Sequence, residues 1–254
     1  MKNFKKHCFP IVCFFLFLGK LTAQNFNYTL SQDSSVYTSL ESPTTICKGG
    51  MCSSGDKTID LPFLFSFCGK ETRVVNVEAN GALNFKGSLS LSVFNQFTLN
   101  GNSTSSISYK VDGASGHRIV KIQYQNLAEG KHAKHDYLSY QIWLYENGNH
   151  LEIRVGENYA STTTVQTTVP DSVWQDVKAF EKKNPSFDEK ATTYEYRVLM
   201  ALINKSWNTP DKAYCIEGAY SSPKGKKITG DEDLSYVKGF PSKGMIYKLT
   251  PSFK

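Results

Sequence analysis

Short stretches in which apolar and polar residues alternate recur along this chain, and this is the pattern of half-buried β-strands. The clearest pair predicts a hairpin, whose arms each place their apolar residues on one face: Leu138, Tyr140, Ile142 and Leu144, then Leu151, Ile153 and Val155. Asn147–Asn149 supplies turn residues between the arms. Further strands are predicted over residues 26–30, 58–67, 73–78, 82–85, 118–124, 194–202 and 245–249.

Two local signals refine this pattern. Asn80–Gly81 lies between two predicted strands and is a strong tight-turn signal, so these strands should form a hairpin. Pro62 lies within the strand predicted at 58–67. Because proline has no N–H to donate to a neighbouring strand, its presence indicates an edge strand or the start of a strand.

Many short strands with long connections predict an all-β fold. We expect a two-sheet antiparallel β-sandwich, jelly-roll-like, that forms a single domain over residues 25–254. One short helical insertion is predicted at 171–183, where Pro170–Ser172 supplies a cap and Asn184–Pro185 ends the helix.

The first 24 residues change the compartment in which this fold is expected. Lys2, Lys5 and Lys6 precede an apolar stretch over Cys8–Leu18, and Ala23 lies at a small-residue exit. This is the pattern of a secretory signal peptide over residues 1–24, with a retained N-terminal membrane helix as the alternative. We therefore expect an exported protein that is periplasmic, held at the cell surface or secreted, with no transmembrane segment in the mature chain.

Charge and cysteine content narrow the possible partners and bonds. The formal net charge of +6 falls to about +2 without residues 1–24, and no Lys/Arg cluster stands out, so we do not expect a nucleic acid partner. Four cysteines remain, an even number that suggests two disulfides in an exported chain. Cys47 and Cys52 can close a small glycine-containing loop, which leaves Cys68 to pair with Cys215. A zinc site is the alternative, but a second close cysteine pair is lacking.

Several segments together carry a resemblance. They are Phe26–Ser31, Leu61–Gly69, Val75–Phe85, His117–Asn126, Tyr140–Glu146 and Pro241–Pro251. In this order the chain resembles a β-sandwich module that recurs in exported proteins of Bacteroidetes. That resemblance implies an exported, usually surface-associated sandwich with no established catalytic residues. The chain departs from the pattern of this module in two ways. It carries the predicted helical insertion, and it ends at Lys254 without the C-terminal sorting domain common in such proteins.

Two residues are candidates for ligand binding. Trp143 and Tyr145 should point away from the apolar face of their strand, and flat aromatic rings on an outer sheet surface can stack against sugar rings. Alternatively, the helix predicted at 171–183 packs over them.

The candidates for catalysis and metal binding are weaker. Glu152 and Glu157 lie on one predicted strand, as the two carboxylates of a sandwich-fold glycosidase do, but Arg154 stands where a tuning aspartate is expected. Ser115 lacks the spacing of a nucleophile elbow and precedes a strand, which indicates a flexible loop. Metal ligands could come from His132 and His135 or from the acidic turn at 231–233, but we interpret both segments as solvated loops.

These observations predict an exported, non-enzymatic β-sandwich that acts as a binding or adhesion module for a glycan or an envelope protein partner. One alternative is a glycan-active hydrolase that uses the carboxylates of the Glu152/Glu157 strand, and another is a structural envelope protein. No cofactor and no catalytic residue is predicted. The sequence leaves the ligand, the oligomeric state and the exact location in the envelope open.

Overall fold

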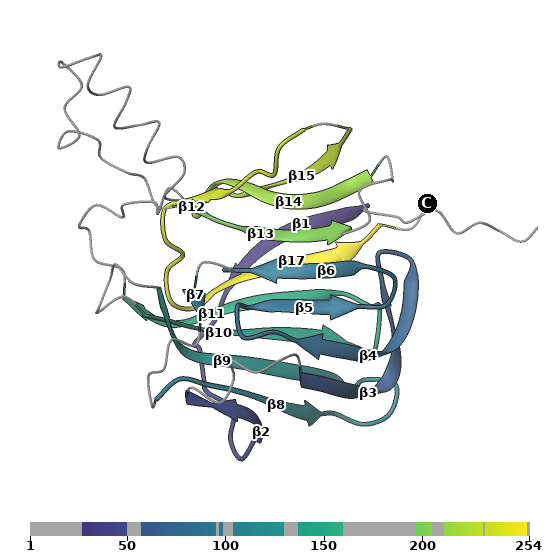
Figure 1. The fold of residues 1–254 in the computed structure, drawn as a ribbon, viewed down its shortest axis with the longest axis vertical. Helices are drawn as coiled ribbons and strands as arrows, with labels where there is room; N and C mark the ends of the chain where they lie inside the picture. Colours follow the sequence, from purple (N-terminus) through teal and green to yellow (C-terminus); the bar gives the residue numbers. More distant parts are fainter. Residues whose placement is uncertain are drawn as a thin grey trace, which may run out of the picture.

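The computed structural model describes residues 27–49, 57–94, 97–98, 104–129, 137–159, 197–204, 211–230 and 232–252. These residues form two β-sheets that pack face to face (Figure 1). The predicted leader, the start of the domain at residue 25 and the helix predicted at 171–183 lie outside the described residues. Within the described residues, no helix is long and apolar enough to cross a membrane.

The first sheet runs from the N-terminal strand at one edge to β2 at the other. Its strands, in spatial order, are β1 (Tyr28–Ser34), β17 (Met245–Pro251), β11 (Leu151–Tyr159), β10 (Tyr137–Tyr145), β9 (Ile119–Glu129), β8 (Ser106–Asp112) and β2 (Thr44–Lys48), with β7 (Phe97–Thr98) also paired to β9. The second sheet contains β12 (Arg197–Val198), β16 (Val237–Lys238), β14 (Asp211–Ala219), β13 (Met200–Asn204), β6 (Leu89–Val93), β5 (Ala82–Phe85), β4 (Lys70–Val77) and β3 (Lys57–Phe67), with β15 (Lys224–Thr229) also paired to β14.

This arrangement confirms the predicted two-sheet sandwich. Consecutive strands mostly stay in one sheet, as the antiparallel meanders β3–β6 and β8–β11. The path is therefore more local than the two Greek keys of a jelly roll. Among the strands that the structure describes, only β14 and β16 pair in parallel. The last strand, β17, lies between β1 and β11, so both ends of the described chain close the same sheet.

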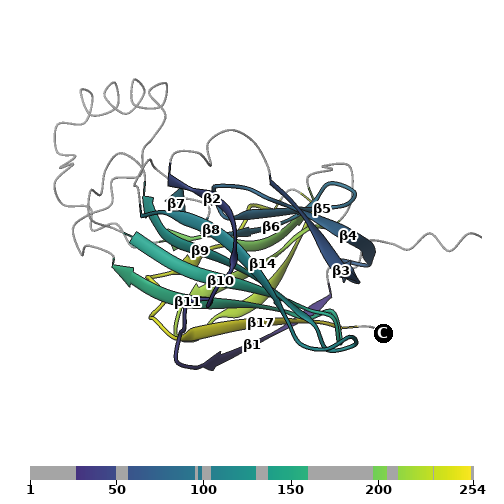
Figure 2. The same ribbon diagram turned by 90° about the horizontal axis from the view of Figure 1, so that it is seen from below.

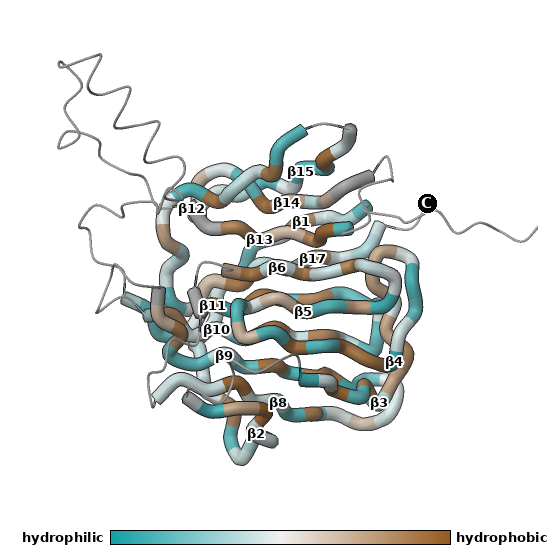
Figure 3. The backbone as a smooth tube through the Cα atoms, viewed as in Figure 1, coloured by the Kyte–Doolittle hydropathy of each residue, from teal (hydrophilic) through white to brown (hydrophobic). Residues whose placement is uncertain are grey.

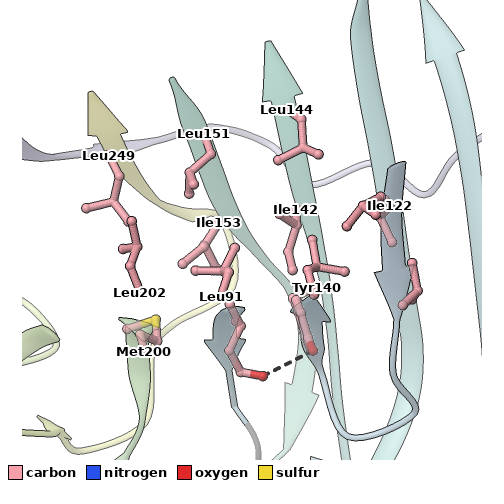
Figure 4. Packing of buried hydrophobic residues seen from close by; sticks show 14 of the residues in the cluster. Leu91, Ile122, Tyr140, Ile142, Leu144, Leu151, Ile153, Met200, Leu202 and Leu249 are labelled. Carbon is pink, nitrogen blue, oxygen red and sulfur yellow. Dashed lines mark hydrogen bonds between the residues drawn. The ribbon is translucent and has the colours of Figure 1, made fainter. Parts of the chain in front are cut away.

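The main core lies between the sheets and is made by the inward residues of alternating strands. From the first sheet, Tyr140, Ile142 and Ile153 point toward Leu91 and Met200 of the second sheet (Figure 4). Ile142 is fully buried between its cross-strand neighbours Ile122 and Ile153. The predicted hairpin of β10 and β11 and its apolar face are thereby confirmed.

Both local turn and edge signals are confirmed as well. Gly81 has a φ of +84°, and the Ala82 amide donates to Asn80 Oδ1 at 3.1 Å in the tight turn between β4 and β5. β3 is the edge of the second sheet, and its pairing with β4 is interrupted between Asp60 and Phe65, around Pro62. The proline sits where no ladder hydrogen bond is needed.

The predicted bridge between Cys68 and Cys215 is wrong. Both are buried free thiols. Cys68 follows β3 and packs in the main core, whereas Cys215 lies on β14 and packs on the opposite face of the same sheet. Several strands separate β14 from β3, and at about 4.8 Å per strand the gap is on the order of 20 Å, far beyond the ~7 Å limit between Cα atoms. Cys47 is disulfide-bonded; Cys52 lies outside the described residues, so its pairing with Cys47 stays a prediction.

Iodoacetamide should therefore leave Cys68 and Cys215 unmodified in the folded protein. Burial excludes the reagent and raises the pKa of both thiols, so little reactive thiolate forms at neutral pH. In urea without reductant, mass spectrometry should find both residues alkylated. If both peptides remained unmodified in urea until a reductant was added, the free-thiol assignment would be wrong.

Candidate functional site

The outer face of the first sheet carries a row of polar and aromatic side chains that the register places side by side. Directly opposed pairs connect five strands in the order Lys110, Lys121, Trp143, Glu152 and Lys248. The neighbouring row places Gln123, Gln141 and Arg154 next to one another. Trp143 thus faces away from the core while Ile142 faces into it, as the strand alternation predicted.

A connecting segment crosses this face. Residues 35–43, which we call the strap, link β1 at one edge of the sheet to β2 at the other, and the connection passes over the strands in Figure 2. Gln141 Nε2 donates to the Thr38 carbonyl at 2.9 Å, and the Leu40 amide donates to Gln123 Oε1 at 2.9 Å. These bonds explain why Gln123 and Gln141 are buried on a face that the sequence marks as polar.

The strap is also fixed at its β1 end. Arg154 Nη2 donates to Ser35 Oγ at 2.5 Å, and the Ser35 amide donates to the Gly244 carbonyl at 2.9 Å. Tyr37 lies against Gly156 so closely that a Cβ at Gly156 would collide with its ring. Gly156 therefore gives the strap room to approach β11. In Figure 3, which is coloured by hydropathy, polar and apolar residues are interspersed along the strands of the sandwich.

Trp143 is held in one orientation by its neighbours. Its Nε1 donates to Gln141 Oε1 at 2.8 Å. Lys121 Nζ, from β9, lies 4.1 Å from the centre of the indole ring, and the Arg154 guanidinium, from β11, lies 4.0 Å from it. Both distances are within the range of cation–π attraction. Cations from the two flanking strands therefore contact the ring faces that a stacking ligand would need.

An open groove of about 250 Å³ lies between the strap and Trp143. Its lining residues are Val36, Tyr37, Thr38, Ser39, Leu40, Glu41, Lys110, Asp112, Lys121, Gln141, Trp143 and Arg154. Most of the lining residues are polar, and Tyr37 and Trp143 are the aromatic residues among them. Ligand sites in proteins are usually concave and mostly apolar with a few precisely placed polar groups, so this groove is more polar than most such sites.

The charges in the groove are paired unevenly. Asp112 contacts Lys121 at 2.7 Å and Lys110 at 3.5 Å, and these lysines lower the pKa of its carboxyl group below the ordinary value. Arg154 is balanced by Glu152 at 2.8 Å. At the β8–β9 side of the groove, the single negative charge of Asp112 is thus shared between the ammonium groups of Lys110 and Lys121.

Tyr145 lies beside this site without lining the groove. Its ring stacks on His150 at 4.0 Å between centroids and is tilted against Trp143 at 6.2 Å. Burial is the main cause of the raised pKa of Tyr145. The structure therefore brings the two predicted ligand-binding residues together, but it places only Trp143 at the groove.

The carboxylates of the hydrolase alternative do not form a facing pair. Glu152 is bound by Arg154, and Glu157 is bound by Lys243 at the end of β11. Glu157 follows Glu152 by five positions along the strand, a distance of roughly 16 Å between Cα atoms. Paired carboxylates of glycosidases lie within about 10 Å of each other. This geometry leaves each carboxylate in its own ion pair.

The loop that contains Ser115 is a turn pinned by a carboxylate. Glu146 accepts hydrogen bonds from the Arg118 guanidinium and from the amides of Arg118 and Gly116, and these bonds, above all those of the guanidinium, lower the pKa of Glu146 to about 2. The segment is thus a loop, as expected, but these hydrogen bonds hold it in place at its Gly116–Arg118 end. His132 and His135 lie outside the described residues, as does Asp231. Within the described part of the chain, no group of three or more His, Cys, Asp or Glu residues could hold a metal ion.

Sequence reasoning missed Lys110, Lys121 and Gln141 as parts of the site. The signal that could have found the last two is the register of the predicted strands at 118–124 and 138–144, which opposes Lys121 to Trp143 and Gln123 to Gln141. The strap has no alternation of polar and apolar residues, so its path over the sheet could not be predicted from strand register.

The fold therefore defines a two-sheet antiparallel β-sandwich whose polar outer face carries a groove beneath the strap. The chain belongs to the NIDO-related family, whose sequence profile matches residues 27–196. That range spans β1 to β11, and the later strands complete both sheets. No curated protein and no solved structure matches the chain.

Proposed function

We propose that this protein is an exported adhesion-like module that binds a glycan in the groove between the strap and Trp143. Membership of the NIDO-related family supports an extracellular adhesion-like role. The leader pattern of residues 1–24 supports export. The structural envelope protein considered from the sequence would have no need of a preformed groove.

The observation that carries the proposal is the groove itself. Its side chains are held before any ligand arrives, because Gln141, Trp143 and Arg154 are fixed by hydrogen bonds, cation–π contacts and an ion pair. Such preorganisation lowers the entropic cost of binding. Amide, hydroxyl and charged groups around one indole match the many hydroxyls of a saccharide.

The size of the groove favours a glycan over an envelope protein. Its volume of about 250 Å³ is slightly below the usual range for small-molecule sites, ~300–1,000 Å³. A stable protein–protein contact instead buries about 800 Å² on each partner. The ion-paired carboxylates on β11 favour binding over hydrolysis, since neither is placed as an acid–base partner of the other.

A glycan array probed with the purified exported protein tests this proposal. We expect binding to a limited set of saccharides and at least a tenfold loss of affinity in Trp143→Ala, which removes the aromatic wall. Tyr159→Ala is the matched control, because Tyr159 is an exposed aromatic residue of the same sheet that does not line the groove. Binding to no saccharide, or equal losses in the two variants, would overturn the proposal.

A further inference from the structure

Two lysines that line the groove, Lys110 and Lys121, bring two positive charges close together, and binding of a neutral ligand gives no reason for this. Lys110 and Lys121 lie directly opposite each other on β8 and β9. Like charges at directly opposed positions of a sheet destabilise it. Asp112 is the carboxylate that contacts both, and Glu41 lines the groove from the strap side. An anion placed between the lysines would relieve their repulsion.

These lysines also keep hydrogen-bonding capacity that faces the groove. An ammonium group has three N–H donors, and one contact with Asp112 uses only one of them. The side chain of Lys110 is 37% exposed and that of Lys121 is 16% exposed, and both line the groove. Lys121 is additionally held over the indole ring at 4.1 Å, so its ammonium group is positioned before a ligand binds.

The cations on Trp143 decide how a saccharide can bind there. A neutral sugar that stacks on the indole must displace Lys121 or Arg154 and lose a cation–π contact. An acidic sugar can bind the ammonium groups while they stay on the ring. The same contacts that hinder stacking therefore favour an anionic ligand.

We propose that the groove recognises an acidic group of its glycan, a sugar carboxylate or a sulfate ester, through Lys110 and Lys121. This inference rests on the function proposed above. Trp143 then serves as the wall that holds Lys121 in place, and Asp112 is the internal carboxylate with which the ligand competes.

Binding of the exported protein to matched polymers tests the inference. Polygalacturonate and its fully methyl-esterified form share one sugar backbone but differ in charge, and dextran sulfate and dextran form the corresponding sulfate pair. We expect at least one acidic polymer to bind at least tenfold more tightly than its neutral counterpart at moderate salt, and the pair that shows the difference identifies carboxylate or sulfate.

Three variants separate a site from general charge attraction. Lys110→Gln should weaken binding of the acidic polymer about tenfold, as expected for loss of a charged hydrogen bond. Lys248→Gln removes the same charge from the same face outside the groove and should change binding less than twofold. Asp112→Asn removes the competing carboxylate and should strengthen binding several-fold.

The outcomes distinguish this inference from the proposed function. Equal losses in Lys110→Gln and Lys248→Gln would show nonspecific attraction and overturn the inference. Neutral polymers or array saccharides that bind as tightly as acidic ones, with binding lost in Trp143→Ala, would overturn the acidic specificity and leave the glycan function standing. Binding to no saccharide of either kind would overturn both.

Discussion

Replacing Gly81 with alanine is expected to lower the free energy of unfolding by about 4 kcal/mol or more. Gly81 has a φ of +84°, which L-residues rarely adopt. A Cβ at this position would also collide with the Val93 carbonyl oxygen and the Tyr140 hydroxyl. Neither atom can move cheaply, because Val93 belongs to β6 and the Tyr140 hydroxyl donates to its carbonyl at 3.2 Å.

The packing around Tyr140 makes relaxation costly. Its ring is fully buried, stacks on Tyr124 at 4.8 Å and meets Phe94 edge-on at 5.1 Å. The hydrogen bond from its hydroxyl is drawn in Figure 4. The added methyl group at Gly81 must therefore disturb contacts between the two sheets as well as the turn.

Gly116→Ala is the control for this prediction. Gly116 has nearly the same φ, +86°, but a Cβ there would meet nothing within 4 Å. It should lose only the conformational term, about 1–2 kcal/mol. Urea unfolding followed by far-UV circular dichroism measures both variants. Similar losses in the two would mean that the collision at Gly81 is relieved elsewhere, contrary to the prediction.

Local patterns predicted the parts of the fold that depend on local chemistry. The alternation around Ile142, the Asn80–Gly81 turn and the edge position of Pro62 each follow from properties of a few neighbouring residues. The segment around Cys215 gave no such signal, because Ala213–Ile216 is buried on both faces of β14 and so does not alternate. The pairing of Cys68 with Cys215 rested on elimination, which takes no account of the strands between them.

The groove required information that local patterns do not hold. Trp143 was identified from alternation, but its covering by Lys121 and Arg154 depends on the register of three strands. The strap crosses the sheet because β1 and β2 lie at its opposite edges, and this placement is a property of the whole topology. Sequence reasoning could therefore name one wall of the site but not the site.

Ile142→Ala should destabilise the protein by about 3–4 kcal/mol, whereas Trp143→Ala should cost clearly less, about 1–2 kcal/mol. Ile142 is fully buried in the main core, so truncation leaves a cavity between the sheets. Trp143 is only half-buried and lies on the outer face, so its removal loses the cation–π contacts and one hydrogen bond while water can enter the space.

Urea melts followed by circular dichroism separate the possible results, with Ile142→Val as a control that should lose only about 1 kcal/mol. Equally large losses of stability at positions 142 and 143 would mean that Trp143 is buried like a core residue. Trp143 could then not contact a ligand in the groove. A small loss in Ile142→Ala would contradict the assignment of that face of β10 to the core. A large loss at Ile142 and a small one at Trp143 would leave the tryptophan free for a binding role, because its substitution would remove ligand contacts without unfolding the sandwich.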